Sequence, residues 1–112
     1  MKFFLISALL SAGVYANTPE EQGRITFLQV HKAPDSTSDS GNRFIVSLNG
    51  EISENPCGGD QWSGYLTSET GNAQYSMLLS AAISGKEVKI EGNANFKCEG
   101  KAMLIRNIYL LF

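Results

Sequence analysis

Residues 71–90 read GNAQYSMLLSAAISGKEVKI and combine two periodicities. Apolar side chains recur with helical spacing at Tyr75, Leu78, Leu79, Ala82 and Ile83, which predicts an amphipathic helix over residues 72–84. Asn72 is suited to cap the start of this helix, and Gly85 to end it in a left-handed conformation. Val88 and Ile90 then alternate with polar residues, which predicts a half-exposed strand directly after the helix.

Four further segments have strand character: residues 24–33, 43–53, 61–67 and 101–112. In the first, the apolar positions change parity between Phe27 and Leu28, which predicts a bulge or a sharp bend. The last is apolar on both faces, as in a strand buried on both sides. Residues 17–23 are polar and predict a loose lead-in, and residues 34–42 a solvated loop.

The expected order is three strands, one helix and two strands, in a mainly β chain. This is the order of the OB-fold, a five-stranded, partly open Greek-key barrel with one α-helix between strands three and four. In such a barrel the helix fills one end and buries its apolar stripe there. A plain β-sandwich is the alternative, but it gives the helix no partner.

The first 16 residues have the pattern of a secretory signal peptide: basic Lys2, an apolar run over residues 3–10, and small-residue cleavage after Ala16. A membrane anchor is the alternative, although the apolar run is shorter than the roughly 20 residues that span a bilayer. We therefore expect one domain over residues 17–112, secreted or periplasmic and not inserted in a membrane. Loss of Lys2 shifts the formal net charge from −2 to −3, which argues against binding to nucleic acid or to anionic lipid.

The two cysteines, Cys57 and Cys98, predict one disulfide in an exported chain. His31 is the only histidine, so the sequence lacks the ligands of a zinc site and a base for a Ser/His or Cys/His nucleophile. Paired carboxylates such as Glu87 and Glu91 read as surface charge. We expect no metal, no cofactor and no enzymatic activity.

A candidate ligand site consists of Asp60, Gln61, Trp62 and Tyr65, because aromatic faces beside carboxylate and amide groups suit a sugar. The alternative is that Trp62 packs against the disulfide or the helix. The loop over residues 34–42 is a second candidate contact, since OB-folds often bind ligands there.

The late cysteine pair, the helical stretch YSMLLSAAISGK and the strand KEVKI resemble the B subunits of subtilase cytotoxin and the related pertussis-like and typhoid-type AB5 toxins. The resemblance covers residues 57–110. It implies an OB-fold that assembles as a ring of five and binds cell-surface glycans, often with terminal sialic acid. It places no sugar-contacting residue of that family on a numbered position of this chain.

Two hypotheses follow. In the first, the protein is a glycan-binding B-subunit-like module whose partners are a cell-surface glycan and a toxin A subunit. Its helix would line a central pore with Gln74, Ser76 and Ser80, and strand edges would pair between subunits. In the second, it is a monomeric OB-fold protein with a structural, inhibitory or small-ligand-binding role, and charges such as Lys86 and Lys89 protect its edges.

Overall fold

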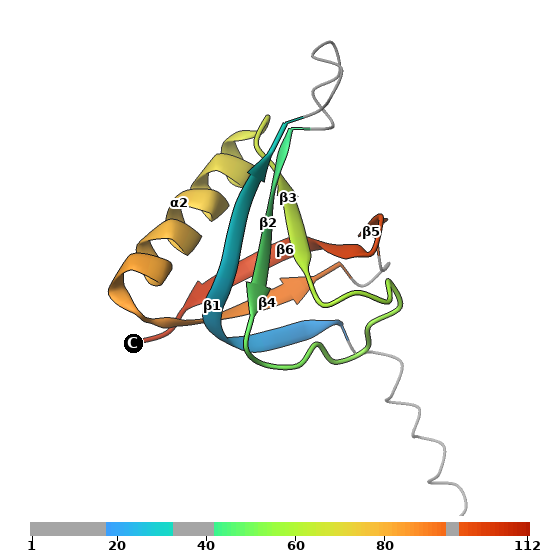
Figure 1. The fold of residues 1–112 in the computed structure, drawn as a ribbon, viewed down its shortest axis with the longest axis horizontal. Helices are drawn as coiled ribbons and strands as arrows, with labels where there is room; N and C mark the ends of the chain where they lie inside the picture. The colour runs from blue at the N-terminus through green and yellow to red at the C-terminus, as the bar shows by residue number, and fades with distance from the viewer. Residues whose placement is uncertain (1–17, 33–41, 94–96) are drawn as a thin grey trace, which may run out of the picture.

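The computed structural model describes residues 18–32, 42–93 and 97–112 (Figure 1). The signal peptide predicted over residues 1–16 and nearly all of the loop predicted over residues 34–42 lie outside these ranges. The described residues form six strands and one helix: β1 (Glu20–His31), β2 (Arg43–Leu48), β3 (Trp62–Tyr65), α2 (Glu69–Ser84), β4 (Glu87–Gly92), β5 (Cys98–Glu99) and β6 (Ala102–Leu110).

The strands form one sheet in the order β3-β2-β1-β4-β6-β5. Neighbouring strands in this order pair antiparallel. In addition, β3 and β6 form a short parallel pairing that joins Trp62 to Met103 and Ser63 to Leu104. This pairing closes the sheet partly into a ring. The prediction of a mainly β, barrel-like fold with one helix after the third strand is confirmed, and the two-residue β5 is an addition to the five predicted strands.

The strand β1 belongs to both halves of the barrel. Its first residues, Glu20–Arg24, pair with β4, and Ile25–His31 pair with β2. The register shifts between Ile25 and Phe27, which confirms the predicted bulge. The loose lead-in predicted over residues 17–23 is wrong from Glu20 onward, because backbone pairing with β4 holds this polar segment in the sheet.

The core lies inside the barrel and beneath α2. Its buried members come from four strands and the helix: Phe44, Val46, Leu48, Trp62, Leu78, Ala81, Val88, Ile90 and Met103. The Tyr75 ring on α2 lies against the Phe44 ring on β2, with 5.8 Å between centroids. The helix therefore covers one end of the barrel, as Figure 1 shows.

The helix begins one turn earlier than the sequence predicts. Its N-cap is Ser68 and not Asn72, because the Ser68 Oγ accepts the Gly71 amide at 2.9 Å. At the other end Gly85 has φ of 69°, so the predicted left-handed C-cap is confirmed.

The buried face of α2 is also rotated from the predicted stripe. The buried residues are Gly71, Leu78 and Ala81, while Leu79 and Ile83 are 41% and 79% exposed. The reason lies at Gly71, where a Cβ would come within 1.6 Å of the Tyr65 carbonyl oxygen. This close approach turns the Gly71 side of the helix toward the barrel, and the predicted Leu79–Ile83 edge faces outward.

Three strands differ from their predicted extent or burial. The strands expected over residues 43–53 and 61–67 are β2 and β3, which end at Leu48 and Tyr65. In β6 only Ala102 and Met103 are buried, so burial on both sides is wrong for its second half. The helix covers one end of the barrel rather than the outer side of β6, which leaves Tyr109 43% exposed.

The predicted disulfide between Cys57 and Cys98 is present, with 5.7 Å between the Cα atoms. It connects the loop before β3 to β5. In the chain-entropy approximation a crosslink over 41 residues stabilises the fold by about 4 kcal/mol. Within the described residues no helix combines the length and the apolar character needed to cross a membrane.

Candidate functional site

The structure spreads the four predicted ligand residues along β3. Asp60 and Gln61 precede the strand, Trp62 begins it and Tyr65 ends it. Trp62 and Tyr65 are therefore roughly 10 Å apart along the strand, at about 3.3 Å per residue. Their side chains point to opposite faces, because the two residues are three positions apart in the strand. The four residues do not form one pocket.

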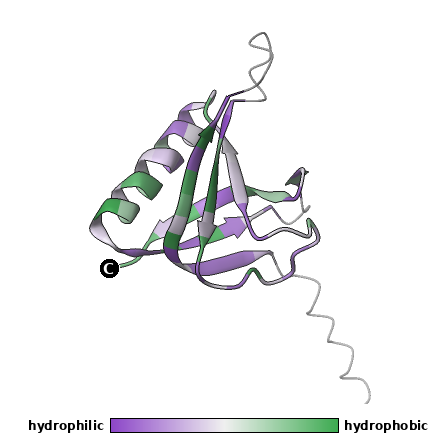
Figure 2. Cartoon of the chain, in the orientation of Figure 1, coloured by the Kyte–Doolittle hydropathy of each residue, from purple (hydrophilic) through white to green (hydrophobic). Residues whose placement is uncertain are grey.

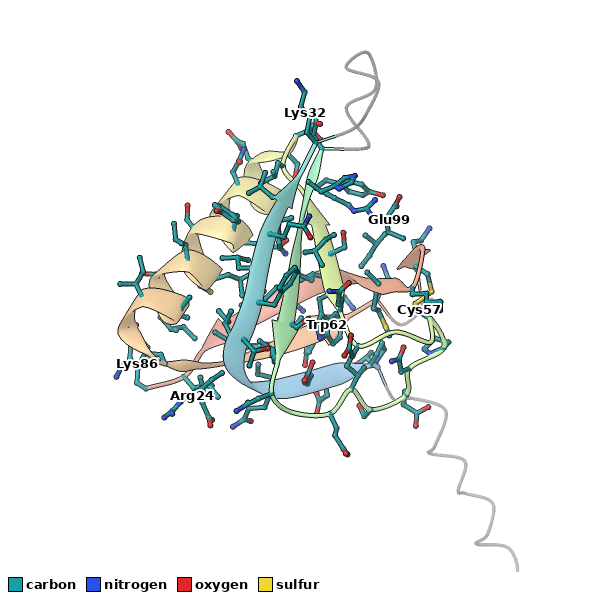
Figure 3. All side chains as sticks on the ribbon, viewed as in Figure 1. Arg24, Lys32, Cys57, Trp62, Lys86 and Glu99 are labelled. Carbon is teal, nitrogen blue, oxygen red and sulfur yellow. A yellow bond between two sulfur atoms is a disulfide. The ribbon has the colours of Figure 1, made fainter. Side chains whose placement is uncertain are left out.

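Trp62 lies in the centre of the barrel and is fully buried (Figure 3). Its Nε1–H donates to Oε1 of Glu21 at 2.9 Å, and Glu21 is only 3% exposed. The Trp62 ring thus has no free face for stacking on a sugar. It packs in the core, which agrees with the alternative prediction for this residue.

The Glu21 carboxyl has a pKa above its ordinary value. Burial is the main cause, and the nearby charge of Asp60 adds to it. Hydrogen bonds from Trp62 and from the Gly50 amide act in the opposite direction and do not cancel the effect of burial. Glu21 and Trp62 form a buried polar pair with a structural role.

A polar row crosses the outer face of the sheet at the other end of β3. His31, Arg43 and Tyr65 are direct neighbours across β1, β2 and β3. The Tyr65 hydroxyl donates to Oε1 of Glu99 on β5 at 2.6 Å, and Arg43 Nη1 donates to Oε2 of the same carboxylate at 3.1 Å. Glu99 is the second residue of β5 and is labelled in Figure 3.

Side-chain hydrogen bonds in this row link strands of the sheet. Both Glu99 oxygens accept hydrogen bonds, and the bond from Tyr65 raises the pKa of the phenol, with burial adding to the effect. The arrangement joins β5 to β2 and β3 and fixes the Tyr65 side chain.

Next to Tyr65 a cavity of about 290 Å³ lies between the end of β3, the start of α2 and β6. Its lining includes Ser63 and Tyr65 from β3, Ser68 and Thr70 from the helix start, Gln74, and Arg106 from β6. This volume is at the small end of the range, about 300–1,000 Å³, that small-molecule sites occupy. The cavity exists because β3 and β6 pair only at Trp62 and Ser63 and separate beyond them.

Hydrogen bonds define the walls of this cavity. Gln74 Nε2 donates to the Arg106 carbonyl at 3.1 Å and thereby joins α2 to β6. Ser63 is fully buried, and its hydroxyl has no hydrogen-bond partner among the residues that the structure describes. A buried polar group without a partner requires an explanation, and a bound ligand is one.

The described part of the chain contains no group of three or more His, Cys, Asp or Glu side chains that could hold a metal ion. Comparison of the chain with models of known protein families, with curated proteins and with solved structures finds no match.

Of the predicted site residues, only Tyr65 lines the cavity. Sequence reasoning missed Ser63, Ser68, Thr70, Gln74 and Arg106. One signal was available: strand alternation places Trp62 and Ser63 on opposite faces, so a buried Trp62 leaves Ser63 on the outside. The positions of the helix and of β6 decide which of the outward residues are covered. No local sequence pattern specifies these positions.

Proposed function

We propose that the protein is an exported, non-catalytic binding protein whose barrel holds a hydroxylated ligand, such as the end of a glycan chain, in the cavity beside the start of α2. The cavity is the observation that supports this proposal. It combines hydroxyl and amide groups with the partly buried ring of Tyr65, and such groups bond sugar hydroxyls and pack against sugar C–H faces. The disulfide is consistent with a periplasmic or extracellular location.

A glycan array probed with the mature protein tests this function. We expect binding that is weakened by Thr70→Ala, which removes an exposed hydroxyl at the cavity. The matched control is Thr67→Ala, because Thr67 is also exposed but is not part of the cavity lining. Binding to no glycan, or equal loss in both variants, would contradict the proposed site.

A second proposal concerns assembly into a ring with the role of a toxin B subunit. Its support is the exposed apolar surface on the C-terminal half of α2, where Figure 2 shows hydrophobic residues. Leu79 and Ile83 are one helical turn apart and 41% and 79% exposed, and α2 contacts β1, where Phe27 and Val30 are 43% and 55% exposed. Beyond Arg24, β1 pairs only with β2 among the described strands, so its other edge has no strand partner there and a neighbouring subunit could pair with it.

Light scattering after size exclusion measures the native mass. A ring of five predicts a mass near five chains. Ile83→Asp should lower this mass, because it places a charge in the exposed apolar group. Ala73→Asp is the control and should leave the mass unchanged, since Ala73 is an exposed helix residue outside that group. A single-chain mass for the unmodified protein would instead favour the monomeric binding protein. A toxin A subunit as partner is a prediction that depends on the ring.

A further inference from the structure

We propose that the cavity beside the start of α2 holds an oxyanion group of its ligand: a carboxylate, sulfate or phosphate. This inference rests on the proposed binding function and adds the charge of the ligand. It follows from three features of the cavity: the amino end of a helix, an unpartnered buried hydroxyl, and the sign of the charges in the lining.

The first feature is the helix start. α2 has 16 residues, and its N-cap Ser68 and Thr70 of its first turn line the cavity. The capping bond satisfies only the Gly71 amide, so the Thr70 amide has no acceptor among the described residues. Free amides and the positive end of the helix dipole together favour a bound anion.

The second feature is Ser63. Its side chain is fully buried at the cavity, and no described residue accepts from or donates to its hydroxyl. Leaving a buried hydroxyl without a partner costs free energy that a bound acceptor would recover. This observation is independent of the helix, because Ser63 is held in β3 by pairing with Ile45 and Leu104.

The third feature is charge. Among the described residues, the cavity lining contains the cation Arg106 and no acidic side chain. The hydrogen bond from Asn107 is the main cause that lowers the pKa of Glu91, and the charge of Arg106 makes a smaller contribution. The acidic residue of the first helical turn, Glu69, is exposed and does not line the cavity.

The geometry suggests how an anionic ligand would be oriented. One oxyanion group would accept hydrogen bonds from the Thr70 amide and the Ser63 hydroxyl and face Arg106, while Tyr65 and the hydroxyls of Ser68 and Thr70 contact the rest of the molecule. The bond from Gln74 to the Arg106 backbone holds the two walls at a fixed separation. The volume of about 290 Å³ restricts the enclosed part of the ligand to a small group.

A matched pair of probes tests the charge. D-Gluconate and sorbitol are both six-carbon polyols, but only gluconate carries a carboxylate. In ¹⁵N-resolved NMR titrations of the mature protein, we expect gluconate to shift the amide signals of Thr70 and Gly71, and sorbitol to leave them in place. Inorganic sulfate and phosphate distinguish a site for free ions from one that needs a carboxylate on a polyol, and both results support the shared oxyanion chemistry.

Four variants sharpen the test. Arg106→Gln should weaken gluconate binding on the order of tenfold, the equivalent of about 1.4 kcal/mol. Ser63→Ala should weaken binding without lowering the stability of the fold, because it deletes an unsatisfied buried group. Glu69→Gln should strengthen binding by removing a nearby negative charge. Lys86→Gln, which removes a cation at the opposite end of α2, should have no effect.

The outcomes separate this inference from the proposed function. Equal shifts with sorbitol and gluconate, together with binding to neutral glycans, would overturn the oxyanion site and leave the binding function standing. No response to any probe and an empty glycan array would overturn both. Gluconate binding without a glycan array signal would support the oxyanion site and remove the glycan as its ligand.

Discussion

At each end of β3 an aromatic side chain donates a hydrogen bond to a glutamate, but the two pairs have different surroundings. At its start, Trp62 donates a hydrogen bond to Glu21 inside the barrel, and at its end, Tyr65 donates to Glu99 on the outer face. Glu21 is 3% exposed, and burial is the main cause that raises its pKa. Glu99 is partly exposed and paired with Arg43. The inner pair is part of the core, whereas Tyr65 of the outer pair lines the cavity and Glu99 does not.

This difference shows that an aromatic residue beside a carboxylate does not by itself identify a binding site. Tyr65 of the outer pair borders a cavity, whereas the barrel surrounds the inner pair. Four experiments test this contrast.

Loss of the disulfide should have the largest effect. The double variant Cys57→Ser/Cys98→Ser should lower the free energy of unfolding by about 4 kcal/mol, because the crosslink closes a loop of 41 residues. Urea denaturation of the oxidised protein and of the variant measures the difference. Since β5 carries Cys98 and Glu99, NMR signals of the outer pair should change more than those of the inner pair. The opposite pattern would contradict the role of the disulfide in positioning Glu99.

Trp62→Phe should have the next largest effect, about 3 kcal/mol of stability. It removes the indole donor to Glu21 and leaves a small cavity in the core. Chemical denaturation followed by far-UV circular dichroism is suitable, because the variant lacks the only tryptophan. The same substitution in a Glu21→Gln background should cost less, since a neutral amide is less expensive to leave unpaired than a buried carboxyl. Equal costs in both backgrounds would show that packing alone explains the effect.

Tyr65→Phe should lower stability by about 1 kcal/mol or less. The hydroxyl bonds a carboxylate that keeps its ion pair with Arg43 and lies near solvent. The same denaturation experiment measures it. A loss as large as that of Trp62→Phe would mean that the outer pair is as much a part of the core as the inner one, and the contrast between the two ends of β3 would fail.

The sequence predicted the order of the elements well, because alternation in Val88 and Ile90, the parity change after Phe27 and the glycine at 85 are local signals. The rotation of α2 was not predictable, since it depends on the contact between Gly71 and the Tyr65 carbonyl. This contact forms only when the helix packs against the end of β3. The cavity was missed for the same reason. Its lining combines Ser63, Thr70 and Arg106, which come together only when the barrel closes.

Glu21→Gln should have the smallest effect, and this effect should depend on pH. In the folded protein the pKa of Glu21 is raised above its ordinary value of 4.5. As pH rises above 4.5, the unfolded chain therefore loses the Glu21 proton before the folded chain does, so this group lowers the stability of the fold with increasing pH. Glutamine can still accept the Trp62 bond and does not ionise.

The free energy of unfolding of Glu21→Gln, minus that of the unmodified protein, should thus increase between pH 4 and pH 7. Glu91→Gln is the matched control with the opposite sign. Hydrogen bonds from Asn107 and Tyr109 are among the causes that lower the pKa of Glu91, with the bond from Asn107 the largest. Its carboxylate stabilises the fold above the unfolded pKa, and this contribution is lost on acidification through the folded pKa. The difference for Glu91→Gln should therefore decrease as pH rises. If the Glu21→Gln difference also decreased, Glu21 would be stabilised as a carboxylate inside the barrel, and burial would not be what distinguishes the two ends of β3.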